Sequence, residues 1–401
     1  MARKGFSKAD WRRIRAEFDA NAEEYGLPEP VYGSVLGASF NIRKLGAKSK
    51  RSRDEWGFLA NVCRRFDLLA IQEIMDDLSG LRHLRDLLGS EFGMIVSDTT
   101  GVFPGEPGLG ERLGFIYNRR TVERTETATD ITFDRTKLIS TIAANYDSLK
   151  EVAEPHIRVF KEYNEQLAAF ANGLRADKPR KPQFNVQLPT FLSFIRAPFC
   201  VSFRIAGHSG TQPYEFLAIN AHLYFGRFMS DRRQELDALM EWILARVRED
   251  DTTYAPNFVL MGDLNLDFDR PETDRKRIEK HLRGFAARSG QKYIVNFPFL
   301  DKHPKQSRYL RTNARLSQTF DQIGLFCRDD RFPAFSDNRH MGSSRVGPDY
   351  GVFEFTQLIC KALHGKRLGA LTRSQKEELF SRLEHSISDH MPLWLRMPLP
   401  Q

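Results

Sequence analysis

Polar side chains stand at the ends of the short apolar runs in this sequence, where a layered fold exposes reactive groups. They comprise four carboxylates, three amides and two imidazoles: Glu73, Asp263, Asp321, Asp389, Asn41, Asn220, Asn265, His222 and His390. Carboxylate and amide oxygens suit a hard cation such as Mg2+, which keeps water and substrate phosphate as its other ligands. The histidines are better suited to proton transfer and phosphate contact. The inventory therefore favours a metal site that handles a phosphate group.

Each of these motifs has an ordinary structural explanation when it stands alone. Gly262–Asp263–Leu264–Asn265 is a common turn sequence. Ser388–Asp389–His390 suits a helix-capping or Asx turn, and Asn220–Ala221–His222 fits hydrogen-bonded polar residues at a strand end. The functional interpretation rests on all of them occurring in one order, each at the end of an expected strand.

The elements that must position these residues are short strands alternating with a few helices. Runs rich in Val, Ile, Phe and Tyr predict strands at Val35–Asn41, Asp67–Gln72, Met94–Ser97, Leu113–Asn118, Phe199–Ile205, Glu215–Asn220, Phe258–Met261, Phe320–Phe326 and Met391–Arg396. Helical spacing predicts helices at Asp54–Phe66, Leu81–Leu88, Arg232–Val247, Arg275–Arg288, Phe353–Leu363 and Arg373–Leu383. This alternation indicates an α/β or α+β layered domain.

We expect one domain over residues 31–398, preceded by a charged amphipathic extension at 1–30. Two stretches break the rhythm of strands and helices, and we interpret 121–189 and 328–384 as insertions on the core domain. The first contains Leu149–Arg175, an amphipathic segment that we expect to be interrupted at Pro155.

Composition excludes several classes of protein. The chain has 401 residues, of which 41% are hydrophobic and 28% charged, a balance typical of a globular protein with a real core. No apolar run approaches a membrane span, and the first thirty residues do not resemble a secretory signal. The four cysteines lie far apart, which argues against a disulfide scaffold and predicts a reducing, cytoplasmic compartment. The net charge of +8 is compatible with a polyanionic partner.

Taken together, the motifs resemble those of the endonuclease/exonuclease/phosphatase superfamily. The matching motifs are Phe40–Asn41–Ile42–Arg43, Gln72–Glu73, Asn220–Ala221–His222, Gly262–Asp263–Leu264–Asn265, Phe320–Asp321–Gln322–Ile323 and Ser388–Asp389–His390. They extend from Val35 to Pro398, nearly the whole chain. The resemblance implies an α+β fold: a four-layered α/β/β/α sandwich of two mixed β-sheets flanked by helices, with the site at the sandwich edge.

Within the superfamily the sequence is most similar to the deoxyribonuclease-like branch. Gly110–Glu111–Arg112 resembles the step that places a glutamate against the first catalytic histidine, and Arg196–Ala197–Pro198 resembles the motif whose arginine supports the scissile phosphate. Arg43 stands where abasic-site endonucleases carry an Asp, which argues against abasic-site repair. Met75 and Leu109 replace the Arg and Tyr with which the branch probes the minor groove, so we expect a different contact with duplex DNA.

The resemblance also suggests a role for each residue of the site. Glu73 is the first choice as metal ligand, with Asn41 and Asp389 beside it. The pairs His222–Glu111 and His390–Asp321 would form two imidazole–carboxylate dyads for proton transfer. Asp263 and Asn265 would position the water or a second cation, and Arg196 would add positive charge at the phosphorus.

These roles predict a divalent-metal-dependent phosphodiesterase that uses Mg2+, with Mn2+ as the alternative. The expected activity is that of a nuclease hydrolysing nucleic acid, DNA before RNA, with low sequence specificity. One alternative is a phosphatase or phospholipase C-type esterase acting on inositol phosphates or sphingolipids. Another, from a different class, is a catalytically inactive nucleic-acid-binding module. The sequence gives no oligomeric state.

Overall fold

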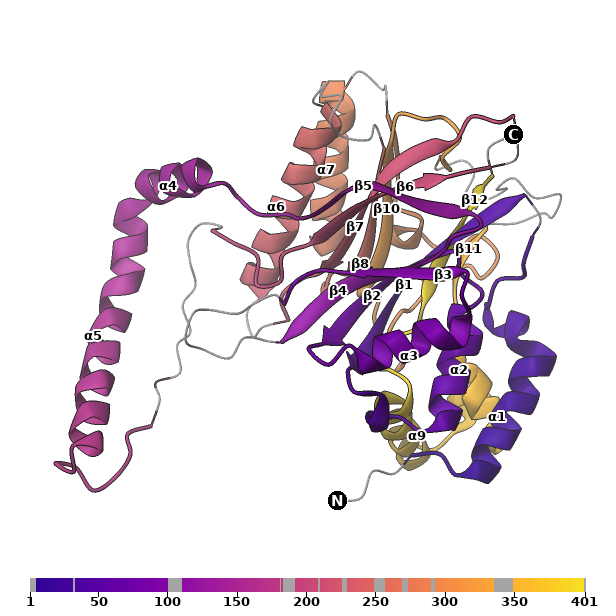
Figure 1. Ribbon diagram of the computed structural model, residues 1–401, viewed down its shortest axis with the longest axis horizontal. Helices are drawn as coiled ribbons and strands as arrows, with labels where there is room; N and C mark the ends of the chain where they lie inside the picture. Colours follow the sequence, from indigo (N-terminus) through magenta and orange to yellow (C-terminus); the bar gives the residue numbers. More distant parts are fainter. Residues whose placement is uncertain are drawn as a thin grey trace.

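Two stacked β-sheets form the centre of the molecule, with helices on both outer faces (Figure 1). The computed structural model describes residues 5–31, 33–99, 110–180, 182, 192–207, 210–225, 229–248, 257–268, 273–289, 293–334 and 349–399. The expected α/β/β/α sandwich is confirmed.

The first sheet has six strands. In spatial order they are β11 (Tyr350–Val352), β12 (Leu393–Pro398), β1 (Ser34–Leu45), β2 (Leu68–Met75), β4 (Glu111–Asn118) and β3 (Phe92–Val96). β1 and β2 run parallel, whereas β12 and β4 run antiparallel to their neighbours β1 and β2. The ends of β1 and β2 and the beginnings of β12 and β4 therefore lie at one edge of the sheet.

The second sheet is built in the same way. Its order is β5 (Val122–Asp130), β6 (Phe199–Ile205), β7 (Tyr214–His222), β8 (Asn257–Asp263), β10 (Asp321–Cys327) and β9 (Ile294–Asn296). β7 and β8 are parallel, and β6 and β10 are antiparallel to them. The register places His222 opposite Asp263 and Asp263 opposite Asp321. The ends of β7 and β8 and the beginnings of β6 and β10 thus lie at one edge of this sheet.

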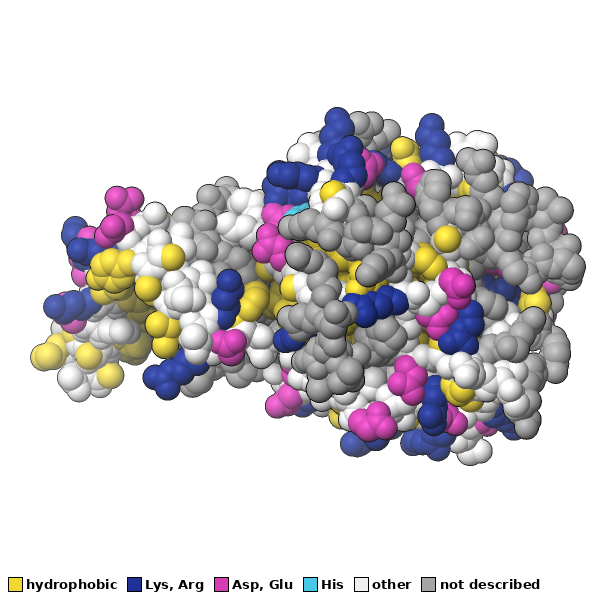
Figure 2. All heavy atoms as spheres, turned by 90° about the horizontal axis from the view of Figure 1, so that it is seen from above, with side chains coloured by type: hydrophobic (Ala, Val, Ile, Leu, Met, Phe, Trp, Pro, Cys, Tyr) yellow, Lys and Arg dark blue, Asp and Glu magenta, His cyan; other side chains and the backbone are white. Residues whose placement is uncertain are grey.

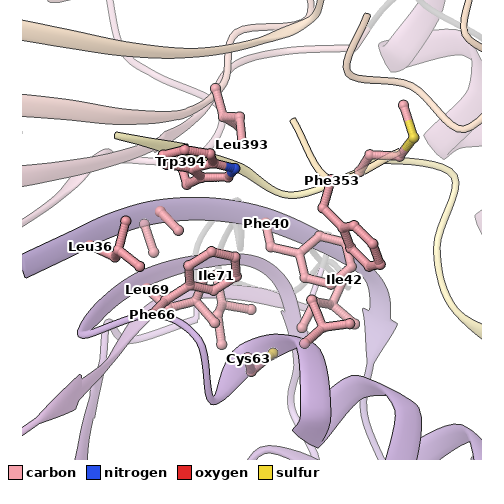
Figure 3. Close-up of a cluster of buried hydrophobic side chains, with 14 of the residues drawn as sticks. Leu36, Phe40, Ile42, Cys63, Phe66, Leu69, Ile71, Phe353, Leu393 and Trp394 are labelled. Atoms are coloured by element: carbon pink, nitrogen blue, oxygen red, sulfur yellow. The ribbon is translucent and has the colours of Figure 1, made fainter. Parts of the chain in front are cut away.

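Helices α1 (Lys8–Asn21), α2 (Arg53–Cys63), α3 (Ser79–Leu88), α8 (Phe355–His364) and α9 (Arg373–Ser386) cover the first sheet. Alternate residues of a strand face opposite sides. In β1 the side chains of Leu36, Phe40 and Ile42 therefore point into this helical layer, where they meet Cys63 of α2 (Figure 3). The intervening residues, Asn41 among them, face the second sheet.

The N-terminal segment is integrated into this layer. Ser7 and Asp10 form a capping box at the start of α1, and Trp11 and Phe18 on its inner face are buried. On the opposite side of the sandwich, α6 (Met229–Arg248) and α7 (Thr273–Ser289) pack on the second sheet around a separate core cluster.

The first expected insertion begins later than the sequence suggested. Residues 122–130 form the edge strand β5, which pairs with β6, so the inserted part starts after Asp130. It contains α4 (Arg135–Ala144) and α5 (Tyr146–Ala171), which project from the sandwich as an arm (Figure 1). Ile157 and Phe160 are among the exposed apolar side chains of the arm. Figure 2 shows hydrophobic side chains on the surface of the arm. Its two ends meet at Phe133 and Phe194, whose rings stack with centroids 6.2 Å apart.

The expected interruption at Pro155 is wrong, because α5 continues through this residue. Proline removes one amide donor from a helix, but the carbonyl that it leaves unpaired can bind water on an exposed helix. No residue of α5 is buried among those that the structure describes, which makes the proline tolerable here.

In the second expected insertion, the strand β11 belongs to the first sheet, since it pairs with β12.

No helix within the described ranges has the length and apolar character needed to cross a bilayer. The four cysteines are free and buried. Burial raises the pKa of the Cys63 thiol to about 12, which makes it a poor nucleophile.

Candidate active site

Glu73 lies at a kink in β2. At this residue the pairing register of β2 shifts against both of its neighbouring strands, β1 and β4. Glu73 also has a positive φ of +57°. A left-handed backbone is unfavourable for a glutamate, and such strain accumulates at functional sites. Lys44, in the matching bulge of β1, also has positive φ and donates its backbone N–H to Glu73 Oε2 at 3.0 Å. The two bulges turn the Glu73 carboxylate towards Asn41.

Asn41 connects the two sheets. Its Nδ2 donates to Glu73 Oε1 at 3.2 Å in the first sheet and to Asp263 Oδ2 at 3.0 Å in the second. The residue is buried, and its Oδ1 has no hydrogen-bond partner in the described structure. The amide thus holds two carboxylates in place and leaves one acceptor unused.

Asp263 is the point at which the site converges. Its Oδ2 lies 3.7 Å from Nε2 of His222 and 3.5 Å from Nε2 of His390, and its Oδ1 accepts the backbone N–H of Asn265 at 2.9 Å. Burial alone would raise the pKa of Asp263, but the charges of His390 and His222 and these hydrogen bonds lower it. The ionised carboxylate therefore lies between two imidazoles.

His390 and Asp321 form the first expected dyad, with Nδ1 of His390 2.8 Å from Oδ2 of Asp321. Burial opposes the charged imidazolium, yet the carboxylates of Asp321 and Asp263 raise the pKa of His390 well above its usual value. Burial likewise raises the pKa of Asp321, and Asp263 adds to this effect. The ring is oriented by its carboxylate, which leaves Nε2 directed towards Asp263.

His222, Glu111 and Arg196 form a second group. Glu111 Oε2 accepts from Arg196 Nε at 2.5 Å and lies 3.4 Å from Nδ1 of His222. Burial raises the pKa of Glu111, but His222 and Arg196 more than offset this and lower the pKa to about 2. One carboxylate thus holds a histidine and an arginine on the same side of the site.

Asn265 closes the network, because its Nδ2 and Arg196 Nη1 both donate to the carbonyl of Leu223, at 2.8 and 3.3 Å. Asn265 has φ +53°, a conformation that asparagine adopts more easily than most residues. Nine of the ten expected site residues are therefore joined by direct contacts or through the Leu223 carbonyl.

Asp389 occupies a more peripheral position. Its side chain is 43% exposed, and its Oδ2 lies 3.9 Å from Nε of Arg43. Arg43 in turn contacts Glu384 of α9 at 2.5 Å. Leu109, which stands where the deoxyribonuclease-like branch carries its minor-groove Tyr, is outside the described residues.

Several supporting residues were not assigned roles from the sequence. Asn220 donates to the carbonyls of Ile71 and Gly114 at 3.0 and 2.8 Å and accepts from Gln72 at 2.7 Å, so it fastens the sheets together where the first one is kinked. Ser388 donates to the Asn41 carbonyl at 2.6 Å and accepts the His390 backbone N–H at 3.2 Å. Both residues lie inside motifs that are recognisable in the sequence, and these motifs were the signal that could have identified their supporting roles.

Glu235 of α6 is a supporting residue that no motif indicated. Its two carboxylate oxygens accept the backbone N–H groups of Ile195 and Tyr224, at 2.8 and 2.6 Å. These amides stand next to Arg196 and shortly after His222. Glu235 therefore joins the segment before Arg196 to the segment after His222. In the sequence it cannot be distinguished from any other glutamate of a helix.

The donor set suits a hard divalent cation. The unused Oδ1 of Asn41 is a buried acceptor beside the Glu73 carboxylate, and an unpaired buried acceptor is unfavourable by about 1–3 kcal/mol. A cation held by these oxygens would remove that penalty. Asp263, Asp321 and His390 form a second group, with one ligand atom each within 4.8 Å of one another. Because His390 is already paired with Asp321, this group fits proton transfer better than Mg2+ binding.

The chain is similar to several known proteins. No family model matches the chain. A deoxyribonuclease of Thioalkalivibrio sp. (strain K90mix) is 25% identical over 247 residues, which cover 60% of this chain and 48% of the relative. The chain therefore spans about half the length of this curated relative.

Similar solved structures include an endonuclease/exonuclease/phosphatase family protein from Bacteroides thetaiotaomicron (13% identity, TM-score 0.42, covering 92% of this chain and 99% of that one). Another is the catalytic domain of human nocturnin with bound sulfate (10% identity, TM-score 0.45, covering 92% and 95%).

The paired six-stranded sheets of this chain bring the motif residues together at one edge of the sandwich.

Proposed function

We propose that the chain is a divalent-metal-dependent phosphodiesterase, and specifically a nuclease that hydrolyses DNA with low sequence specificity. The observation that carries this proposal is the approach of two histidines, each backed by its own carboxylate, to the single buried carboxylate of Asp263. Hydrolysis of a phosphodiester anion requires an activated water, a protonated leaving group and neutralisation of charge. The site offers side chains for each requirement.

In this proposal Glu73 and Asn41 hold a divalent cation, with Asp389 at the periphery. When bound, the cation supplies neutralisation of the non-bridging phosphate oxygens. Asp263 accepts a hydrogen bond from the attacking water and orients it. One imidazole takes the proton of that water while the other protonates the leaving oxygen, and Arg196 stabilises charge on the phosphorane.

Nucleic acid is favoured over inositol phosphates or sphingolipids by the Glu111–Arg196 contact, which matches the deoxyribonuclease-like motifs, and by the net charge of +8. The curated relative named deoxyribonuclease supports the same choice. A substrate panel should contain supercoiled, linear and single-stranded DNA, RNA, inositol phosphates and sphingomyelin, each with Mg2+, with Mn2+ and with EDTA.

We expect cation-dependent cleavage of DNA that EDTA abolishes. Glu73→Ala should lower the rate by a factor of about 100 or more, because its charge would hold the cation. The exposed surface variant Glu377→Ala should retain full activity. Cleavage that is insensitive to EDTA, preferential hydrolysis of the inositol phosphates or sphingomyelin, or DNA binding without turnover would each contradict the proposal.

A further inference from the structure

Phe225 is an exposed aromatic residue three positions after His222. Its side chain is 63% exposed, the largest fraction among the phenylalanines that the structure describes. An isolated apolar residue on a surface is common and has no meaning by itself. The contacts that hold this residue at the active site distinguish it.

Helix α6 fixes the ring and the backbone before it. The guanidinium carbon of Arg232 lies 4.5 Å from the Phe225 ring centroid, and Nη1 of the same arginine donates to the Asn265 carbonyl at 3.1 Å. One turn further along, Glu235 accepts the N–H of Tyr224. Arg232 covers one face of the ring, and the high exposure of Phe225 leaves the rest of the ring accessible.

The loop that carries Phe225 begins inside the catalytic network. The carbonyl of Leu223, two residues earlier, accepts from both Arg196 and Asn265. Since Arg232 also binds Asn265, the ring is tied to the site from two directions. A ligand group next to the scissile phosphate would therefore lie within reach of this aromatic surface.

We propose that Phe225 is a stacking surface for an unpaired nucleobase adjacent to the scissile phosphate, so that the substrate class is single-stranded nucleic acid. The inference rests on the proposed nuclease function. Every base has a π-face that can stack on an aromatic ring, which provides affinity without sequence preference. The guanidinium beneath the ring strengthens the platform through a cation–π contact. In a duplex, neighbouring base pairs cover these faces.

The test uses an oligodeoxynucleotide with a single phosphodiester among phosphorothioate linkages, flanked either by thymidines or by abasic nucleotides. For the thymidine substrate we expect Phe225→Ala to lower kcat/KM about tenfold or more, and Phe225→Trp to restore it. Removing the flanking bases should lower the wild-type value similarly, while Phe225→Ala should lose much less on the abasic substrate. Pairing the thymidine substrate with a complementary strand should reduce wild-type cleavage.

Phe160→Ala on the arm is the matched control and should behave as wild type, and thermal unfolding checks that each variant folds. If Phe225→Ala matches wild type on the thymidine substrate, or loses equally on both substrates, the stacking role is wrong. A wild-type protein that cleaves none of these linkages would instead reject the proposed function itself.

Discussion

At the residue scale, the contacts of Asp263 explain how one carboxylate can serve two histidines. Its Oδ2 faces Nε2 of both rings and also accepts from Asn41, while Oδ1 is held by the Asn265 backbone. The outer nitrogens of the two rings face different carboxylates, Asp321 and Glu111. In the proposed mechanism, this arrangement lets both imidazoles act on the same phosphate.

Glu111→Gln should lower kcat by a factor of about 100 and change KM little, because the variant removes the charge that orients His222 and Arg196. The carboxylate, whose pKa is lowered to about 2, is ionised throughout the neutral range, so its charge is always available in the wild type. Steady-state kinetics at neutral pH provide the measurement. A kcat within a factor of two of wild type would argue against the role of this dyad.

Most of the residues that the sequence singled out lie together because they stand at or near strand ends, and strand polarity brings those ends to one edge. Glu111 and Arg196 were indicated only by the family resemblance. The sequence could not predict the supporting roles of Glu235 and Arg232. Both lie on a helix, and helical spacing indicates only which of its side chains pack against the sheet. The backbone strain at Glu73 was equally hidden, because nothing in the run Asp67–Gln72 signals two register shifts. Asp389 was expected beside Glu73 and Asn41; its side chain lies near Arg43 and Ser388, and its charge acts on His390.

At the element scale, the parallel pair β7–β8 places His222 opposite Asp263. Gly262, with φ +152°, makes this close approach possible, because a Cβ at this position would lie 1.9 Å from the carbonyl oxygen of Ala221. The glycine of the Gly-Asp-x-Asn motif is therefore required by strand packing as well as by the turn.

Gly262→Ala should destabilise the fold by about 1–3 kcal/mol and reduce activity, because the strands must separate next to Asp263. Gly57→Ala in α2 is the matched control, since an added Cβ there meets no atom within 4 Å. Alanine favours a helix over glycine, so this control should be neutral or stabilising by up to about 1 kcal/mol. Denaturant unfolding measures both, and equal stabilities for the two variants would contradict the packing argument.

Asp10→Asn should weaken the docking of α1 by about 1 kcal/mol at neutral pH, since Asp10 accepts from the Ser7 backbone and from Arg382 of α9. Burial raises the pKa of Asp10, but these partners lower it to about 2, below its value of about 3.9 in an unfolded chain. The contribution is therefore present above about pH 4 and is lost as the pH falls towards 2. Unfolding free energies of the two proteins should converge over this interval, and a constant difference would refute the assignment.

Sequence patterns predicted most of the helices and the buried strands but not α4, and several of the failures have physical causes. β5 was placed in an insertion because its residues are mostly polar and only Val122 is buried, as is typical of an edge strand. β9 and β11 have three residues each, too few for a periodic pattern. Helix α5 continues through Pro155, although an interruption was expected there. The proline is tolerated because no described residue of α5 is buried.

At the scale of the whole molecule, the sandwich and the arm are separable in energetic terms. Every buried residue of the two core clusters lies outside α4 and α5 in the described part of the chain. The stacked rings of Phe133 and Phe194 close the base of the arm, so a short connection can replace it.

Replacing residues 135–191 by a short Gly-Ser linker should leave cooperative unfolding intact and shift Tm by less than about 4 °C, because little apolar burial is lost. Differential scanning calorimetry measures the transition. A protein that no longer unfolds cooperatively would show that the arm is part of the folding unit.

The central claim is that residues between Asn41 and His390 gather around one divalent cation held by Glu73 and Asn41. Anomalous diffraction from a crystal soaked in Mn2+ tests it most directly. We predict a peak within coordination distance of the Glu73 carboxylate and the Asn41 Oδ1. A site without a peak, or with its only peak among Asp263, Asp321 and His390, would contradict the claim.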